Sequence, residues 1–207
     1  MAKTANLLVH GLDRSAGDRA ALLLPLHWQT AAVAMGCWSA GLEIVPTGGA
    51  DVAFSAADRL AEASASGAEE VVVLALAPLG GSLPGVPVGT TDYGAEVPGY
   101  ADSFTPAAPV DPAAPALAGR SGAELVEAAR AAAGRWGLHD GDRVLSALRY
   151  DKLDGWLAGL LVPLTIGGGV VLCPRPDLAR LPQRVVEERV TATAGVAVPG
   201  VRELAVG

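Results

Sequence analysis

The chain has 207 residues, of which 51% are hydrophobic, and it carries a formal net charge of −7. This length and composition are sufficient for one large domain or two smaller lobes with a buried core, and they argue against extensive disorder. An acidic chain offers no basic surface for phosphate backbones or anionic lipids, so we expect no nucleic acid and no membrane surface as partners, which leaves small molecules or other proteins.

Two long uncharged runs, residues 20–42 and 155–173, raise the question of a membrane span. Pro25 lies near the start of the first run, and Pro163 and a glycine triplet interrupt the second, so each run divides into segments of the length found in soluble cores. The first 13 residues contain no apolar stretch long enough for a signal peptide. We therefore expect a cytoplasmic protein.

The cysteine and histidine residues form no disulfide or metal-binding pattern. Cys37 and Cys173 each lie inside an apolar segment and form no CxxC pair, which predicts two unpaired, buried thiols. His10, His27 and His139 are far apart in the sequence, and none has an HxxxH or HxH spacing. We therefore expect no metal site.

The segment over residues 20–46 predicts the basic unit of the fold. Residues 20–24 are an apolar run typical of a strand, residues 31–40 are rich in small helix-forming side chains, and residues 42–45 predict a second strand after Gly41. Two strands joined by one helix almost always lie parallel, with a right-handed crossover. The pattern therefore predicts an α/β sheet.

Further elements are expected on both sides of this unit. Residues 2–12 predict a short amphipathic helix, and residues 55–66 predict a helix that ends at Gly67. Residues 71–76 begin with three valines and show no polar alternation, which is typical of a strand buried on both faces.

The second half of the chain begins after an irregular connection. Residues 98–115 contain five prolines. Residues 121–137 predict the clearest helix of the chain, because Ser121 and Glu124 form a capping box and Gly137 follows the last apolar position.

A second strand, helix and strand then repeat the first pattern. The expected elements are a strand over residues 144–147, a helix over 153–165, a strand over 170–173, a helix over 178–188 and a strand over 190–194. The repetition predicts an α/β fold of two similar lobes, with layered parallel or mixed sheets and flanking helices. We place the first lobe at residues 1–97, the Pro-rich connection at 98–110 and the second lobe at 111–207.

Four short motifs occur in order along the chain. They are L-L-L-P at residues 22–25, A-G followed by I-V-P within residues 40–46, G-D-R-V-L-S at residues 141–146, and E-E-R-V-T at residues 187–191. Together they resemble the N-terminal domain of the acyl- and aryl-adenylating enzymes, the family of acyl-CoA synthetases and peptide-synthetase adenylation domains. The resemblance implies that fold, and it implies ATP, AMP or CoA as candidate ligands.

The chain departs from this family where the chemistry is expected. The resemblance implies a Ser/Thr/Gly-rich loop ending in Pro-Lys-Gly just before the helix at Ser121, whose backbone N–H groups hold the ATP phosphates. Residues 111–121 instead read DPAAPALAGRS. Gly119, Arg120, Ser121 and Gly122 remain as candidates for contact with an anion, although the capping box explains Ser121 without a ligand.

A second candidate site follows the strand over residues 144–147. The resemblance implies an aromatic ring near the substrate pocket, and that position falls on Lys152. Tyr150, Asp151, Lys152 and Asp154 could form a polar cluster at the carboxyl end of a parallel strand, where α/β sheets bind ligands. A solvated charged turn is the alternative interpretation of the same residues.

The sequence ends at Gly207, before the family's adenine-binding motif, ribose-binding aspartate and catalytic lysine are reached. We therefore expect a non-catalytic adenylating-enzyme-like protein with a binding or interaction role, without a required cofactor. Because an early stop should leave apolar surface uncovered, we also expect a homodimer. Two alternatives remain: a ligand-binding or enzymatic site rebuilt around Arg120 to Ser121 and Tyr150 to Asp154, and a fragment that needs a partner chain.

Overall fold

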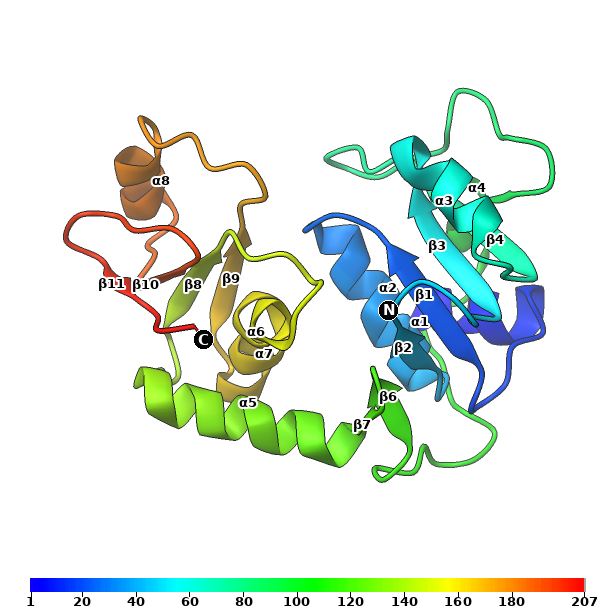
Figure 1. Cartoon of the computed structure of the whole chain (residues 1–207), viewed down its shortest axis with the longest axis horizontal. Helices are drawn as coiled ribbons and strands as arrows, with labels where there is room; N and C mark the ends of the chain where they lie inside the picture. The colour runs from blue at the N-terminus through cyan, green and yellow to red at the C-terminus, as the bar shows by residue number, and fades with distance from the viewer. Residues whose placement is uncertain (207) are drawn as a thin grey trace. The chain divides into compact units, whose positions relative to one another are not determined.

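The computed structural model describes residues 1–206 and contains two β-sheets, each in its own compact unit (Figure 1). Unit 1 comprises residues 1–24 and 28–122, and unit 2 comprises residues 25–27 and the chain from residue 123 onward. Residues 111–122, which we assigned to the second lobe from the sequence, lie in unit 1, because two strands formed there extend the first sheet.

A seven-stranded sheet forms the centre of unit 1, in the order β5-β4-β3-β1-β2-β6-β7. Neighbouring strands run parallel except β6 and β7, which form an antiparallel hairpin at one edge. The predicted parallel pairing of the first two strands is confirmed, because Ala20 of β1 lies opposite Ile44 of β2. The strands are β1 (Arg19–Leu23), β2 (Glu43–Val45), β3 (Val52–Ala56), β4 (Glu70–Leu74), β5 (Thr91–Asp92), β6 (Pro115–Leu117) and β7 (Arg120–Ser121).

Strand β3 corrects the expectation of a helix over residues 55–66. All five residues of β3 are buried, and the strand pairs with β1 on one side and β4 on the other. Ser55, which we expected near a helix N-terminus, therefore lies inside the sheet. Helical structure begins only after the strand, at η2 (Ala57–Arg59) and α3 (Leu60–Ala65).

The remaining helices of unit 1 are mostly short. The helix expected over residues 2–12 is α1, continued by one π-helical turn, η1, and α1 packs against α2. The carboxylate of Asp92 caps α4 by accepting hydrogen bonds from the backbone N–H groups of Gly94 and Ala95. These helices are α1 (Ala2–Asn6), η1 (Leu7–Gly11), α2 (Trp28–Ser39), α4 (Tyr93–Glu96) and η3 (Val97–Gly99).

A four-stranded parallel sheet forms the centre of unit 2, in the order β11-β10-β8-β9. Successive residues of β8 face opposite sides of it. Val144 belongs to the same core cluster as Trp136 and Leu157, whereas Leu145 belongs to the cluster of Val185. Strand β8 is therefore buried on both faces, as the inner strands of parallel sheets usually are. The strands are β8 (Arg143–Ser146), β9 (Gly169–Leu172), β10 (Ala192–Ala194) and β11 (Arg202–Glu203).

The first helix of unit 2 is the one that the sequence predicted most clearly. Helix α5 (Gly122–Trp136) starts directly after Ser121, and Gly167, at a φ of 66°, ends the helical segment that the glycine triplet was expected to break. Within residues 1–206, no helix combines the length and the apolar character that crossing a bilayer demands. The other helices of unit 2 are α6 (Leu153–Trp156), η4 (Leu157–Leu161), α7 (Val162–Ile166) and α8 (Leu181–Glu187).

The two cysteines are buried and unpaired, as predicted. Cys37 lies in α2, and Cys173 follows β9. Burial raises the pKa of the Cys37 thiol to about 12, so this thiol stays protonated and unreactive near neutral pH.

Candidate functional site

A tight β-hairpin occupies the position where the adenylating enzymes were expected to have their phosphate loop. Strands β6 and β7 are joined by two residues, Ala118 and Gly119, with φ angles of 48° and 80°. Two successive positive φ values are the signature of a type I′ turn, the turn that best matches the twist of a hairpin. A two-residue turn leaves no loop that could wrap around a phosphate chain.

The backbone N–H groups of this hairpin already have partners within the chain. The N–H of Ala118 donates to the carbonyl of Ile44 (2.8 Å), and the N–H of Gly122 donates to the carbonyl of Ala114 (3.3 Å). The N–H of Gly119 donates to Oε1 of Glu43, at 2.6 Å. A carboxylate of the chain itself thus binds the group that an anionic ligand would need, and it would repel that ligand.

Arg120 and Ser121 form the short strand β7. The Arg120 side chain is exposed, and it makes no ion pair with any residue in the described range 1–206. Ser121 is half-buried and directly precedes α5. Of the first predicted group, Arg120 is therefore the residue with a charged side chain open to solvent.

Tyr150, from the second predicted group, is part of the packing of unit 2. Its ring stacks on Trp156 at a centroid distance of 4.4 Å, and its hydroxyl donates to the carbonyl of Gly159 at 3.0 Å. A Cβ atom at Gly159 would lie 3.0 Å from the Tyr150 ring, so this position favours glycine. Burial raises the pKa of Tyr150 above its ordinary value, and the phenol therefore stays neutral.

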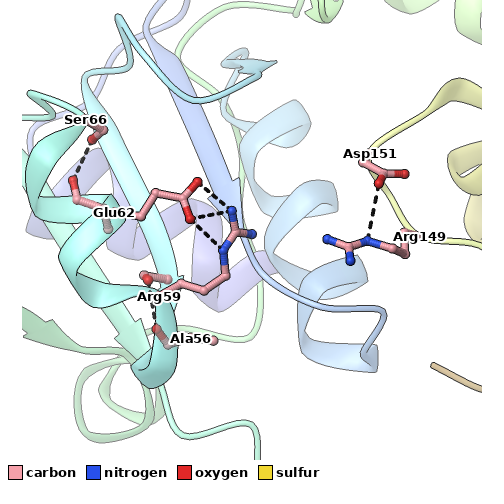
Figure 2. A network of polar contacts seen from close by, with 8 residues as sticks. Ala56, Arg59, Glu62, Ser66, Arg149 and Asp151 are labelled. Carbon is pink, nitrogen blue, oxygen red and sulfur yellow. Dashed lines mark hydrogen bonds and ion pairs between the residues drawn. The ribbon is translucent and has the colours of Figure 1, made fainter. Parts of the chain in front are cut away.

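Asp151 and Lys152 lie on an exposed turn before α6. Nε of Arg149 pairs with Oδ2 of Asp151 at 3.3 Å, as Figure 2 shows, and both side chains are more than half exposed. Lys152 is exposed and stands at the N-cap position of α6. These contacts agree with the alternative interpretation of the sequence, in which these residues form a solvated charged turn. Ligand binding by Gly119 to Gly122, in unit 1, and by Tyr150 to Lys152, in unit 2, stays a prediction.

A side-chain network that the sequence did not reveal connects two of the four motifs. Asp142 accepts a hydrogen bond from the hydroxyl of Thr191 (2.7 Å) at Oδ1 and one from the backbone N–H of His139 (2.9 Å) at Oδ2. The Thr191 hydroxyl also accepts from the N–H of Arg143. The aspartate of G-D-R and the threonine of E-R-V-T thus connect the starts of the neighbouring strands β8 and β10. Their role in this structure is structural.

Unit 1 also contains two cavities that were not predicted from the sequence. One, of about 340 Å³, lies among α1, α2, α4 and the loop after β4. The other, of about 290 Å³, adjoins η1 and β5. Residues 1–206 contain no group of three or more His, Cys, Asp or Glu side chains arranged to hold a metal ion. The cavity walls come from segments far apart in the chain, and no local motif marks them.

Comparison with known proteins identifies the family. No family model matches the chain. A curated protein from Mycobacterium tuberculosis (strain ATCC 25618 / H37Rv), described as a TIGR03089 family protein, is 43% identical over 196 residues, which cover 92% of this chain and 79% of that protein. The chain belongs to the TIGR03089 family.

Solved structures place this TIGR03089 chain among the adenylating enzymes by fold. An acyl-CoA synthetase from Brucella canis matches 94% of the chain with a TM-score of 0.76 and 19% identity, over 40% of its own length. A benzoate CoA ligase from Burkholderia xenovorans LB400 matches 97% with a TM-score of 0.75 and 18% identity, over 46% of its length. MbtA from Mycobacterium smegmatis matches 93% with a TM-score of 0.74 and 25% identity, over 41% of its length.

These matches confirm the resemblance inferred from the four motifs and the predicted α/β class. The chain spans less than half the length of each of these three proteins. What it shares with them is the layered sheet-and-helix scaffold of their N-terminal domain.

Proposed function

We propose that this protein is a non-catalytic relative of the adenylating enzymes, which uses their N-terminal scaffold for a binding or interaction role. The fold is that of acyl-CoA synthetases. The observation that carries the proposal is the hairpin of β6 and β7, in which Glu43 binds the N–H of Gly119.

The physical argument concerns the charge that adenylation must stabilise. Phosphoryl-type transfer depends on positioned N–H groups, cations and Mg²⁺ around the phosphates. In this hairpin the N–H groups of Ala118 and Gly119, like that of Gly122 at the start of α5, are bound to acceptors of the chain itself. ATP could use them only by displacing these acceptors, one of which is a carboxylate. We infer that the hairpin does not replace the phosphate loop.

Carboxylate-dependent pyrophosphate exchange tests the proposal. We expect no exchange above background over a broad panel of carboxylic acids, because each missing contribution to stabilising the transition state is worth several kcal/mol. An active acyl-CoA synthetase in the same assay controls for the reagents, and circular dichroism controls for folding. Calorimetry with ATP should show no binding at the hairpin.

Pyrophosphate exchange above background would contradict the proposal, and two arginine variants show whether the hairpin is responsible. Robust exchange that is lost in Arg120→Ala but kept in Arg130→Ala, an exposed arginine of α5, would overturn the non-catalytic proposal. It would instead support an enzyme whose site has been rebuilt around the hairpin.

A further inference from the structure

The larger of the two cavities of unit 1 lies among three helices and the loop after β4. Its volume of about 340 Å³ lies within the range of about 300–1,000 Å³ that is typical of small-molecule sites. The first two turns of α2 contribute Trp28 and Ala32, the loop after β4 contributes Leu79 and Gly80, and η3 contributes Val97. The elements α1, α2 and α4 that surround it are labelled in Figure 1.

The walls of this cavity are fixed by contacts within unit 1. The indole Nε1 of Trp28 donates to the carbonyl of Pro78 at 3.1 Å, and a Cβ atom on Gly80 would lie 3.7 Å from the indole ring. A Cβ atom on Gly94 would lie 1.8 Å from the carbonyl oxygen of Gly81, so the loop after β4 rests directly on α4. The half-exposed indole of Trp28 is thus held in place, ready to pack against a ligand.

Several polar groups around the cavity are already paired within the chain, while the α-amino group of Met1 and the amide of Gln29 also belong to its wall. The hydroxyls of Thr4 and Tyr93 are hydrogen-bonded to each other at 2.8 Å. The ammonium group of Lys3 donates to the carbonyls of Pro98 (3.1 Å) and Tyr100, and it lies 3.4 Å from Oδ1 of Asp102. Lys3 and Asp102 also cancel each other in charge. What the cavity offers a ligand is therefore mainly the indole face and aliphatic surface.

From this arrangement we infer that the cavity binds a small, uncharged ligand with an aromatic or aliphatic body, which packs against Trp28. An anionic ligand would lose its hydration beside a lysine that is already paired with Asp102, whereas an apolar ring gains contacts with Trp28, Ala32 and Val97. This inference goes beyond the proposed function, because it concerns a different part of unit 1 and holds whether or not the chain forms acyl-adenylates.

The test uses indole and its charged analogue indole-3-acetate with the ¹⁵N-labelled full chain. Indole should shift the side-chain N–H signal of Trp28 and the amide signals of Gly80 and Gly94, with a dissociation constant on the order of 0.1–1 mM. Indole-3-acetate should bind at least about tenfold more weakly, since its carboxylate would have to compete with Asp102 for Lys3.

Two pairs of variants locate the site. Ala32→Phe fills the cavity and should abolish the shifts, whereas Ala61→Phe, at an exposed position of α3, should preserve them. Leu79→Glu places a charge at the rim and should weaken indole binding about tenfold, whereas Val88→Glu should not. The side chains of Leu79 and Val88 are 96% and 105% exposed, so both variants keep the fold intact.

Absence of indole shifts at several millimolar would overturn the inference. So would shifts that survive in both Ala32→Phe and Leu79→Glu. If indole-3-acetate bound more tightly than indole, the ligand class would be wrong, and Lys3 would be the receptor of a carboxylate.

Discussion

At the scale of single residues, Asp142 of the G-D-R motif stabilises the fold through hydrogen bonds. Its side chain is almost completely buried, and burial by itself would raise its pKa. The hydrogen bonds from Thr191 and His139, together with the nearby Arg202, outweigh that effect and lower the pKa of Asp142 below its ordinary value. The ionised carboxylate is therefore a stabilising part of the native state.

A pH dependence of stability follows from this network. Because the folded-state pKa of Asp142 is lowered, its contribution is present above the unfolded-state pKa of about 3.9 and is lost as the pH falls through the folded-state value. Thr191→Val should lower the free energy of unfolding by about 1–2 kcal/mol at pH 7. Part of this deficit should disappear as the pH falls below the unfolded-state value of about 3.9 and through the lower folded-state pKa of Asp142.

Urea unfolding from pH 7 down to the lowest pH at which the chain stays folded measures the effect, with Thr165→Val on the exposed end of α7 as the matched control. A deficit of Thr191→Val that stayed constant over that whole range would show that Asp142 does not carry the interaction.

At the scale of secondary-structure elements, the hairpin of β6 and β7 contains a residue in an unfavourable conformation. Ala118 has a φ of 48°, a region that costs a non-glycine L-residue about 1–2 kcal/mol and that asparagine tolerates better. Ala118→Asn creates an Asn-Gly pair, the preferred sequence of a type I′ turn. We expect it to raise the free energy of unfolding by about 0.5–1 kcal/mol.

Thermal unfolding of Ala118→Asn beside Ala118→Val checks this prediction. Valine is β-branched and should destabilise the same turn. Equal melting temperatures for the two variants would show that the turn is not of type I′ in solution.

Elements with strong local sequence signals could be predicted from the sequence, and elements held by distant partners could not. The parallel pairing of β1 and β2 and the helix α5 followed from local signals: an apolar run, a small-residue helix and a glycine stop. Strand β3, by contrast, has the unremarkable sequence VAFSA, and it is a strand because β1 and β4 pair with it on both sides. Pairing partners far along the chain override local preference at such positions.

The same difference between local and long-range features applies to the candidate sites. The loss of the phosphate loop could be predicted, because the missing motif is a continuous segment. The binding of Gly119 by Glu43 could not, since 76 residues separate them. The cavity beside Trp28 is likewise invisible in the sequence, because its walls come from four separate segments of unit 1.

At the scale of the whole molecule, we propose that the chain self-associates, and that α8 takes part. Among the large apolar side chains of unit 2 in residues 1–206, Val186 and Leu178 are the most exposed, at 75% and 69%. Leu181 and Val185, on the same segment, are buried in the core of unit 2. Two large apolar side chains in water on one segment favour contact with a second copy.

Sedimentation velocity between 1 and 100 μM tests this proposal. The chain should sediment as a dimer at the upper end of that range, and Val186→Lys should shift the balance toward monomer about tenfold, because a charge would be buried at the contact. Val88→Lys, at a fully exposed position in unit 1, is the matched control and should leave the dimer unchanged. A monomer at every concentration would refute self-association, and a dimer equally weakened by both variants would refute the role of α8.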